Sequence, residues 1–143
     1  AEMAALGYDE VERRFLRFKE IRELYKGVIP LDGLSTGFEN LNHITLGYKA
    51  GDLIILGAQT GHGKTAFALH TARTIAVDHG KNILYLNTEM SRQQIALRWG
   101  SILSGIEHDR IRTGDINESE LSLILNGYSR LRESGFIPIL VPT

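Results

Sequence analysis

The sequence predicts an α/β protein with a mainly parallel sheet flanked by helices, and three observations support this. Two short apolar runs, residues 52–57 and 82–87, have the length and composition of strands that are buried on both faces. A glycine-rich turn and a stretch with helical spacing separate them, so the order is strand, loop, helix, strand. Such a crossover unit pairs its strands in parallel. A third apolar run, residues 136–141, predicts a further strand.

The composition is that of an ordinary globular domain. The chain has 143 residues, of which 43% are apolar and 23% are charged. It has no cysteine, which excludes disulfides, cysteine-rich zinc sites and thiol catalysis. A net charge of −1 gives no global electrostatic signal for nucleic-acid binding. No apolar run approaches the ~18–20 residues of a membrane span, and no secretory signal is present, so we predict a cytoplasmic protein without a membrane partner.

An amphipathic helix is predicted from Tyr8 to Lys26, because apolar residues recur there every three or four positions among basic ones. Two interpretations stay open. The helix packs on its own domain with a solvated charged face, or it is a linker that docks on a neighbouring subunit. Glycines and a proline follow it and suggest a boundary. We therefore divide the chain into a linker helix, residues 1–26, and the N-terminal part of a larger domain, residues 27–143.

Three further helices are predicted. The first follows the glycine-rich turn and ends near Gly80, a residue type that commonly terminates helices. Ser91 and Gln94 form the pattern of a capping box that starts the second helix, and a third runs from Asn117 to about Arg132. Trp99 lies on the apolar stripe of the second helix, which favours a core position over a platform for base stacking.

The glycine-rich turn has the pattern of a phosphate-binding loop. It reads Ala58-Gln59-Thr60-Gly61-His62-Gly63-Lys64-Thr65, with alanine where the common pattern has a first glycine. It lies between a predicted strand and a predicted helix, which is the structural context that such a loop requires. The sequence therefore predicts a site for a nucleoside triphosphate, ATP with Mg²⁺.

Each residue type in this loop has a physical role. Glycines let the backbone curl so that N–H groups face the phosphate oxygens, and the helix that begins near Gly63 adds the positive end of its dipole. Lys64 supplies a charge for the β- and γ-phosphates, and the Thr65 hydroxyl is a ligand for Mg²⁺. His62 contributes its backbone N–H. The predicted nucleotide-binding residues are Thr60, Gly61, His62, Gly63, Lys64, Thr65 and Ala66, with Thr65 as metal ligand.

Glu89 is a second candidate, because it falls just past the strand at residues 83–87 and so near the sheet edge where Lys64 emerges. A carboxylate there can orient and polarise the water that attacks a γ-phosphate. Position alone also fits an acidic residue that leads a helix and is stabilised by its dipole.

Residues 27–143 resemble the RecA-like motor domain of the DnaB family of hexameric replicative DNA helicases. Beyond the phosphate loop, the resemblance rests on further blocks, of which the last two are much more characteristic of this family. These blocks are Ser35 to Phe38 with Leu41-Asn42, Gly51 to Ile55, Thr88 to Ser91 with Gln94 and Arg98, and Arg110 to Gly114.

The resemblance implies a RecA-like fold and the role of catalytic glutamate for Glu89, with Lys64 and Thr65 as phosphate and Mg²⁺ contacts. It also implies that residues 1–26 link an N-terminal domain to the motor. Expected partners are single-stranded DNA, further copies in a hexameric ring, a primase and a helicase loader. The second acidic metal motif, the DNA-contacting loops and the arginine finger of the family lie beyond these residues, so we expect this fragment alone to be inactive. Asn87-Thr88 replaces the more usual Ser-Leu before the glutamate.

Two other functions stay open at this point. One is a non-motor RecA-like ATP-binding protein, a regulatory or recombination accessory factor in which ATP controls assembly. The other is an interaction module with a vestigial nucleotide site, against which the presence of Gly63, Lys64, Thr65 and Glu89 argues. The blocks around Glu89 and Arg110 favour a helicase.

Overall fold

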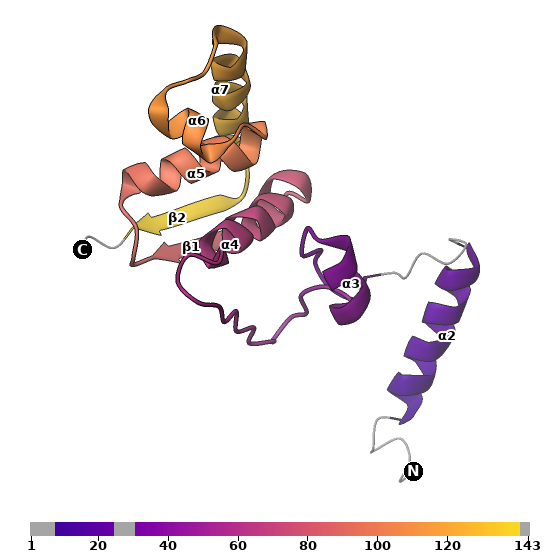
Figure 1. The fold of residues 1–143 in the computed structure, drawn as a ribbon. Helices are drawn as coiled ribbons and strands as arrows, with labels where there is room; N and C mark the ends of the chain where they lie inside the picture. The colour runs from indigo at the N-terminus through magenta and orange to yellow at the C-terminus, as the bar shows by residue number, and fades with distance from the viewer. Residues whose placement is uncertain (1–7, 25–30, 141–143) are drawn as a thin grey trace. The chain divides into compact units, whose positions relative to one another are not determined.

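The computed structural model describes residues 8–24 and 31–140, and the chain divides into two compact units, residues 1–52 and 53–143. Figure 1 shows the order of the elements along the chain. They are α2 (Tyr8–Leu24), α3 (Glu39–Thr45), α4 (Lys64–Arg73), the π-helix η1 (Thr74–Asp78), β1 (Ile83–Asn87), α5 (Arg92–Ser104), α6 (His108–Thr113), α7 (Glu118–Glu133) and β2 (Phe136–Leu140).

The first unit begins with α2, which confirms the predicted helix as far as Leu24; its predicted end at Lys26 lies outside the described residues. Beyond α2, a buried polar cluster organises the unit. Thr36 is fully buried, and both its backbone N–H and its hydroxyl donate to Asn42 Oδ1, at 2.8 and 2.7 Å. The Asn42 amide donates in turn to Ser35 Oγ at 3.0 Å. These bonds satisfy polar groups that burial would otherwise leave unpaired.

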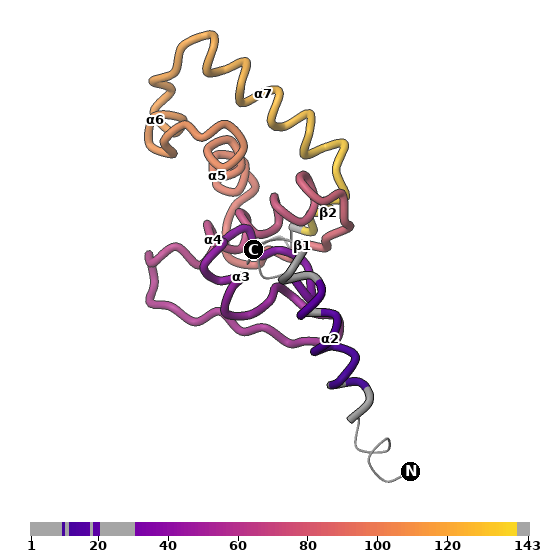
Figure 2. The backbone as a smooth tube through the Cα atoms, turned by 90° about the vertical axis from the view of Figure 1, so that its right-hand side faces the viewer, coloured from indigo at the N-terminus to yellow at the C-terminus, as the bar shows by residue number. Residues whose placement is uncertain are grey.

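The second unit is built on two parallel strands. β1 pairs with β2 in the register Ile83↔Phe136 to Asn87↔Leu140, so two of the three predicted strands are confirmed, the later one as far as Leu140. Helices α5, α6 and α7 connect the strands, as Figures 1 and 2 show. The helix start predicted from the capping box at Ser91 and the one predicted at Asn117 are both present. Ser91 and Gln94 bond reciprocally at the start of α5, and Asn117 and Glu120 do so at the start of α7.

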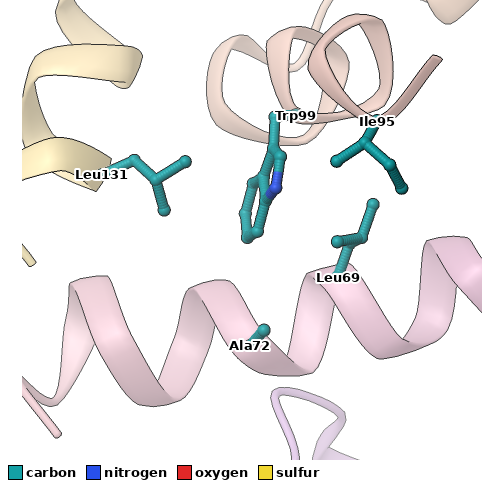
Figure 3. Packing of buried hydrophobic residues seen from close by; sticks show 5 residues of the cluster. All are labelled: Leu69, Ala72, Ile95, Trp99 and Leu131. Atoms are coloured by element: carbon teal, nitrogen blue, oxygen red, sulfur yellow. The ribbon is translucent and has the colours of Figure 1, made fainter. Parts of the chain in front are cut away.

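The core of the second unit lies where α4, α5 and α7 meet. Figure 3 shows Trp99 directed from α5 toward α4, with Leu131 of α7 on one side and Leu69 on the other. Trp99 is 3% exposed and its ring meets that of Phe136 edge-on, with 4.8 Å between centroids. The prediction that Trp99 belongs to the core is therefore confirmed, and this packing holds α5 against the helix that follows the glycine-rich loop.

The predicted strand at residues 52–57 is wrong in this structure. Residues 53–56 have no strand conformation, and their side chains are exposed by 87, 54, 83 and 46% along the run. A strand is held by a hydrogen-bonded neighbour, and in the described part of the chain β1 and β2 pair with each other. The predicted burial of the run is wrong as well, because its composition does not supply the neighbouring strand that a ladder needs.

Three helical features were not predicted. The short helices α3 and α6 carry no long apolar stripe, so periodicity gives little signal for them. The helix after the glycine-rich loop changes to π-helical geometry at Thr74 and ends at Asp78. Gly80 then takes φ = 62°, the left-handed conformation expected of a helix terminator. No helix in the described ranges combines the length and apolar character needed to cross a bilayer.

Candidate nucleotide-binding site

The glycine-rich loop has the curled backbone that phosphate binding requires. Gly61 and Gly63 adopt φ = 85° and 84°, in the left-handed region that disfavours other residues. A Cβ atom added to either glycine would meet no atom within 4 Å. The loop therefore uses glycine for backbone conformation and not for lack of space.

The N-terminus of α4 is open to an anion. Gly63 is its N-cap residue, and being glycine it provides no side-chain capping bond. The first N–H groups of a helix have no acceptor within the helix, and they lie at the positive end of its dipole. A phosphate placed against Lys64, Thr65 and Ala66 would meet these donors directly.

Lys64 is folded back onto the loop. Its ammonium Nζ donates to the backbone oxygens of Ala58 at 2.7 Å and of Gln59 at 3.1 Å. Within the same turn, the His62 N–H donates to Gln59 O at 3.2 Å, so it closes the loop. These carbonyls hold the ammonium beside the place where phosphates would lie, and a bound phosphate chain would compete with them for its protons.

A pocket of about 270 Å³ joins the loop to the end of β1. Glu89 lines it together with Lys64 and Thr65, so the structure brings the two predicted parts of the site together. His62 is the one predicted binding residue that does not line it. The lining residues are Thr60, Gly61, Gly63, Lys64, Thr65, Ala66, Glu89 and Arg98.

The turn that carries Glu89 is held by Asn87, a residue whose role the sequence left unassigned. Asn87 is 6% exposed at the end of β1. Its side-chain amide donates to Met90 O, and its Oδ1 accepts from the Met90 N–H at 3.3 Å. The two bonds close a turn around Thr88 and Glu89. Asn87 therefore has a structural role, because its side chain fixes the backbone from which the Glu89 side chain projects.

Replacing Asn87 by alanine is expected to lower the free energy of unfolding by about 1–3 kcal/mol, because the Met90 backbone groups lose their partners next to a buried position. Urea denaturation followed by circular dichroism measures this. Asn126→Ala, at an exposed position of α7, is the matched control and should change stability by less than ~0.5 kcal/mol. Equal effects of both substitutions would show that the Asn87 turn contributes nothing to stability.

Sequence reasoning missed Arg98 as a site residue, although it was part of the motif around Glu89. Helix α5 places its side chain in the pocket with Lys64 and Glu89. The available signal was its spacing from Ser91, about two turns along a helix that begins next to the glutamate. A larger hollow of about 530 Å³ lies between α5, α7 and β2, but it is mainly apolar and contains no residue of the loop.

Comparison with known proteins gives a consistent family. Residues 33–139 match the sequence profile described as DnaB-like helicase C terminal domain. The chain is 38% identical over 100 residues to the replicative DNA helicase DnaB of Buchnera aphidicola subsp. Baizongia pistaciae, covering 70% of this chain and 21% of that protein. It is 31% identical over 128 residues to the replicative DNA helicase DnaB of Geobacillus stearothermophilus, covering 90% and 26%.

Solved structures show the same fold at lower identity. A DnaB-like replicative helicase studied for its interactions with primase matches with a TM-score of 0.74 and 20% identity, covering 98% of this chain and 30% of that one. A solved ATPase domain matches with a TM-score of 0.68 and 21% identity, covering 90% and 45%. The predicted RecA-like fold, with its parallel strands and flanking helices, is that of these neighbours. The chain spans only about a fifth to a quarter of the curated relatives.

Proposed function

Because this chain belongs to the DnaB-like helicase family, we propose that it is part of an ATP-dependent replicative DNA helicase. In this proposal it binds ATP with Mg²⁺ and, within a ring of like subunits, couples hydrolysis to movement along single-stranded DNA and to unwinding of the duplex. The observation that carries the proposal is the pocket in which Lys64, Thr65 and Glu89 meet. Residues 1–26 serve as the linker and residues 27–143 as the N-terminal part of the motor domain.

The residues present fit a Mg²⁺-bound nucleotide. The uncapped α4 N-terminus and the left-handed glycines offer backbone donors to the phosphates. Lys64 exchanges its bonds to Ala58 O and Gln59 O for phosphate oxygens, and the half-buried Thr65 offers its hydroxyl as a metal ligand. A Mg²⁺ ion held there would neutralise charge on the phosphates.

Glu89 acts as the general base. Glu89 is exposed and lines the pocket, so a water can lie between its carboxylate and the terminal phosphate. It accepts a proton from that water as the water oxygen attacks, and the Asn87 turn holds the backbone on which this alignment depends.

The proposed partners are single-stranded DNA, further copies of the protein in a hexameric ring, a primase and a loader. A structural neighbour is described with its primase interactions, which supports this class of partner. On α2, Phe15 is 66% exposed and Leu16 is 50% exposed. These apolar side chains support the linker interpretation, in which α2 docks on an adjacent subunit.

The test is the ATPase rate of the full-length protein with and without single-stranded DNA, measured alongside its mass in solution with Mg²⁺ and nucleotide. The proposal expects a ring-sized oligomer whose hydrolysis is stimulated by the DNA. Nucleotide binding with no response to DNA would reject the motor and support a regulatory ATP-binding protein instead.

A further inference from the structure

Arg98 occupies a fixed position on the wall of the loop pocket. It lies three positions after Ile95 and directly before Trp99 on α5. These two apolar residues are 5% and 3% exposed and pack in the core between α4 and α5. The core therefore sets the position of α5 relative to the helix that begins at the loop. Because residues three apart share a helix face, Arg98 lies beside Ile95 at the border of the core, half-buried, and lines the pocket.

The guanidinium of Arg98 has no carboxylate partner in the described part of the chain. Its Nε is buried and forms no hydrogen bond, and no ion pair joins Arg98 to Glu89 or to another described acidic residue. Several other arginines of the unit are paired with carboxylates; Arg110, for example, lies 2.6 Å from the Glu120 carboxylate. Buried donors are nearly always satisfied, so the unpaired Arg98 Nε needs an explanation, and a bound anion in the pocket that Arg98 lines would supply one.

The charges around Arg98 point to an anion. The pocket carries a second cation, Lys64, and the open N-terminus of α4. Burial raises the pKa of the Tyr85 hydroxyl, the Arg98 charge opposes that rise and the Glu89 charge adds to it. Arg98 and Glu89 thus both affect the pKa of the Tyr85 hydroxyl, and both line the loop pocket.

We propose that Arg98 is a nucleotide ligand that binds the phosphate chain from the α5 side, opposite the donors of the loop. A guanidinium presents its N–H groups as a planar fork and binds two phosphate oxygens at once, which an ammonium does not. The inference rests on the proposed function, because it deepens the description of the same nucleotide site. It assigns to this chain a second phosphate cation besides Lys64.

The test compares the binding of two probes by the full-length protein. Mg²⁺-ATP and inorganic tripolyphosphate with Mg²⁺ share the phosphate chain, and only ATP has a ribose and a base. Arg98→Met is expected to weaken binding of both probes by about tenfold or more in titration calorimetry. Arg92→Met is the matched control, because Arg92 is exposed on the same helix and does not line the loop pocket.

Each result decides the question. Weaker binding of ATP with unchanged binding of tripolyphosphate would place Arg98 at the ribose or base and overturn the proposal, as would unchanged binding of both. If Arg98→Met does not fold, Arg98→Lys keeps the charge without the fork and should still weaken both probes severalfold; unchanged binding in this variant overturns the proposal. Lys64→Ala distinguishes a failure of the proposed nucleotide site from a failure of the Arg98 proposal. If it leaves both probes bound as before, the nucleotide site itself is wrong, whereas an effect of Lys64 alone rejects only the role of Arg98.

Discussion

Glu89→Gln in the full-length protein is expected to lower the rate of ATP hydrolysis by at least ~100-fold while leaving ATP binding in place. Glutamine keeps the size and polarity of the side chain but does not accept a proton from the attacking water. The Asn87 bonds to Met90 involve the backbone of the turn and not the Glu89 carboxylate, so the substitution preserves the local geometry. Steady-state phosphate release and equilibrium nucleotide binding measure the two effects separately.

The matched control for this prediction is Glu133→Gln, at an exposed position in the last turn of α7. It removes the same charge from the same unit without touching the pocket, so hydrolysis should stay near the wild-type rate. Near-normal turnover by Glu89→Gln would return Glu89 to the role of an acidic residue stabilised by the dipole of α5.

Lys64→Ala is expected to lower nucleotide affinity by an order of magnitude or more, consistent with the loss of ~1.5–3 kcal/mol of charge-assisted hydrogen bonding. In the structure the same substitution also removes the ammonium from Ala58 O and Gln59 O. Both of those residues are exposed, so water can satisfy the freed carbonyls and the fold should be retained. Titration of the variant with Mg²⁺-ATP measures the affinity, and circular dichroism checks the fold.

Lys81→Ala provides the control, because Lys81 is an exposed lysine of the same unit outside the pocket. Its loss changes the net charge by the same amount and should leave nucleotide affinity unchanged. A folded Lys64→Ala variant that binds ATP as tightly as the wild type would remove the phosphate role from Lys64. Equal losses in both variants would indicate a general electrostatic effect of net charge.

Local signals in the sequence were enough to predict most of the second unit. The capping box at Ser91 predicted a helix start through bonds between residues three apart, and apolar spacing predicted the helix from Asn117, so no distant contact was needed. The strand at 83–87 was found from its apolar run, and its partner at 136–140 in the same way. The loop pattern located the positive φ angles at Gly61 and Gly63, because few other residue types adopt them.

The apolar run at residues 52–57 is a segment whose secondary structure local signals did not predict correctly. Its composition indicates a preference for burial, but whether it forms a strand depends on a neighbouring strand that its own residues do not encode. The helices α3 and α6 were missed for a related reason, since short polar helices are stabilised by their surroundings more than by periodicity.

The sequence by itself determined the phosphate loop, the helix and strand that flank Glu89, and the family to which the residues around them belong. Only the tertiary structure decided that Glu89 and Lys64 share one pocket and that Arg98 joins them, with its Nε buried and without a partner among the described residues. It also decided that Asn87 holds the turn of the glutamate. The physical reason is that a motif records spacing along the chain, whereas a binding site depends on side chains that core packing between α4 and α5 brings together.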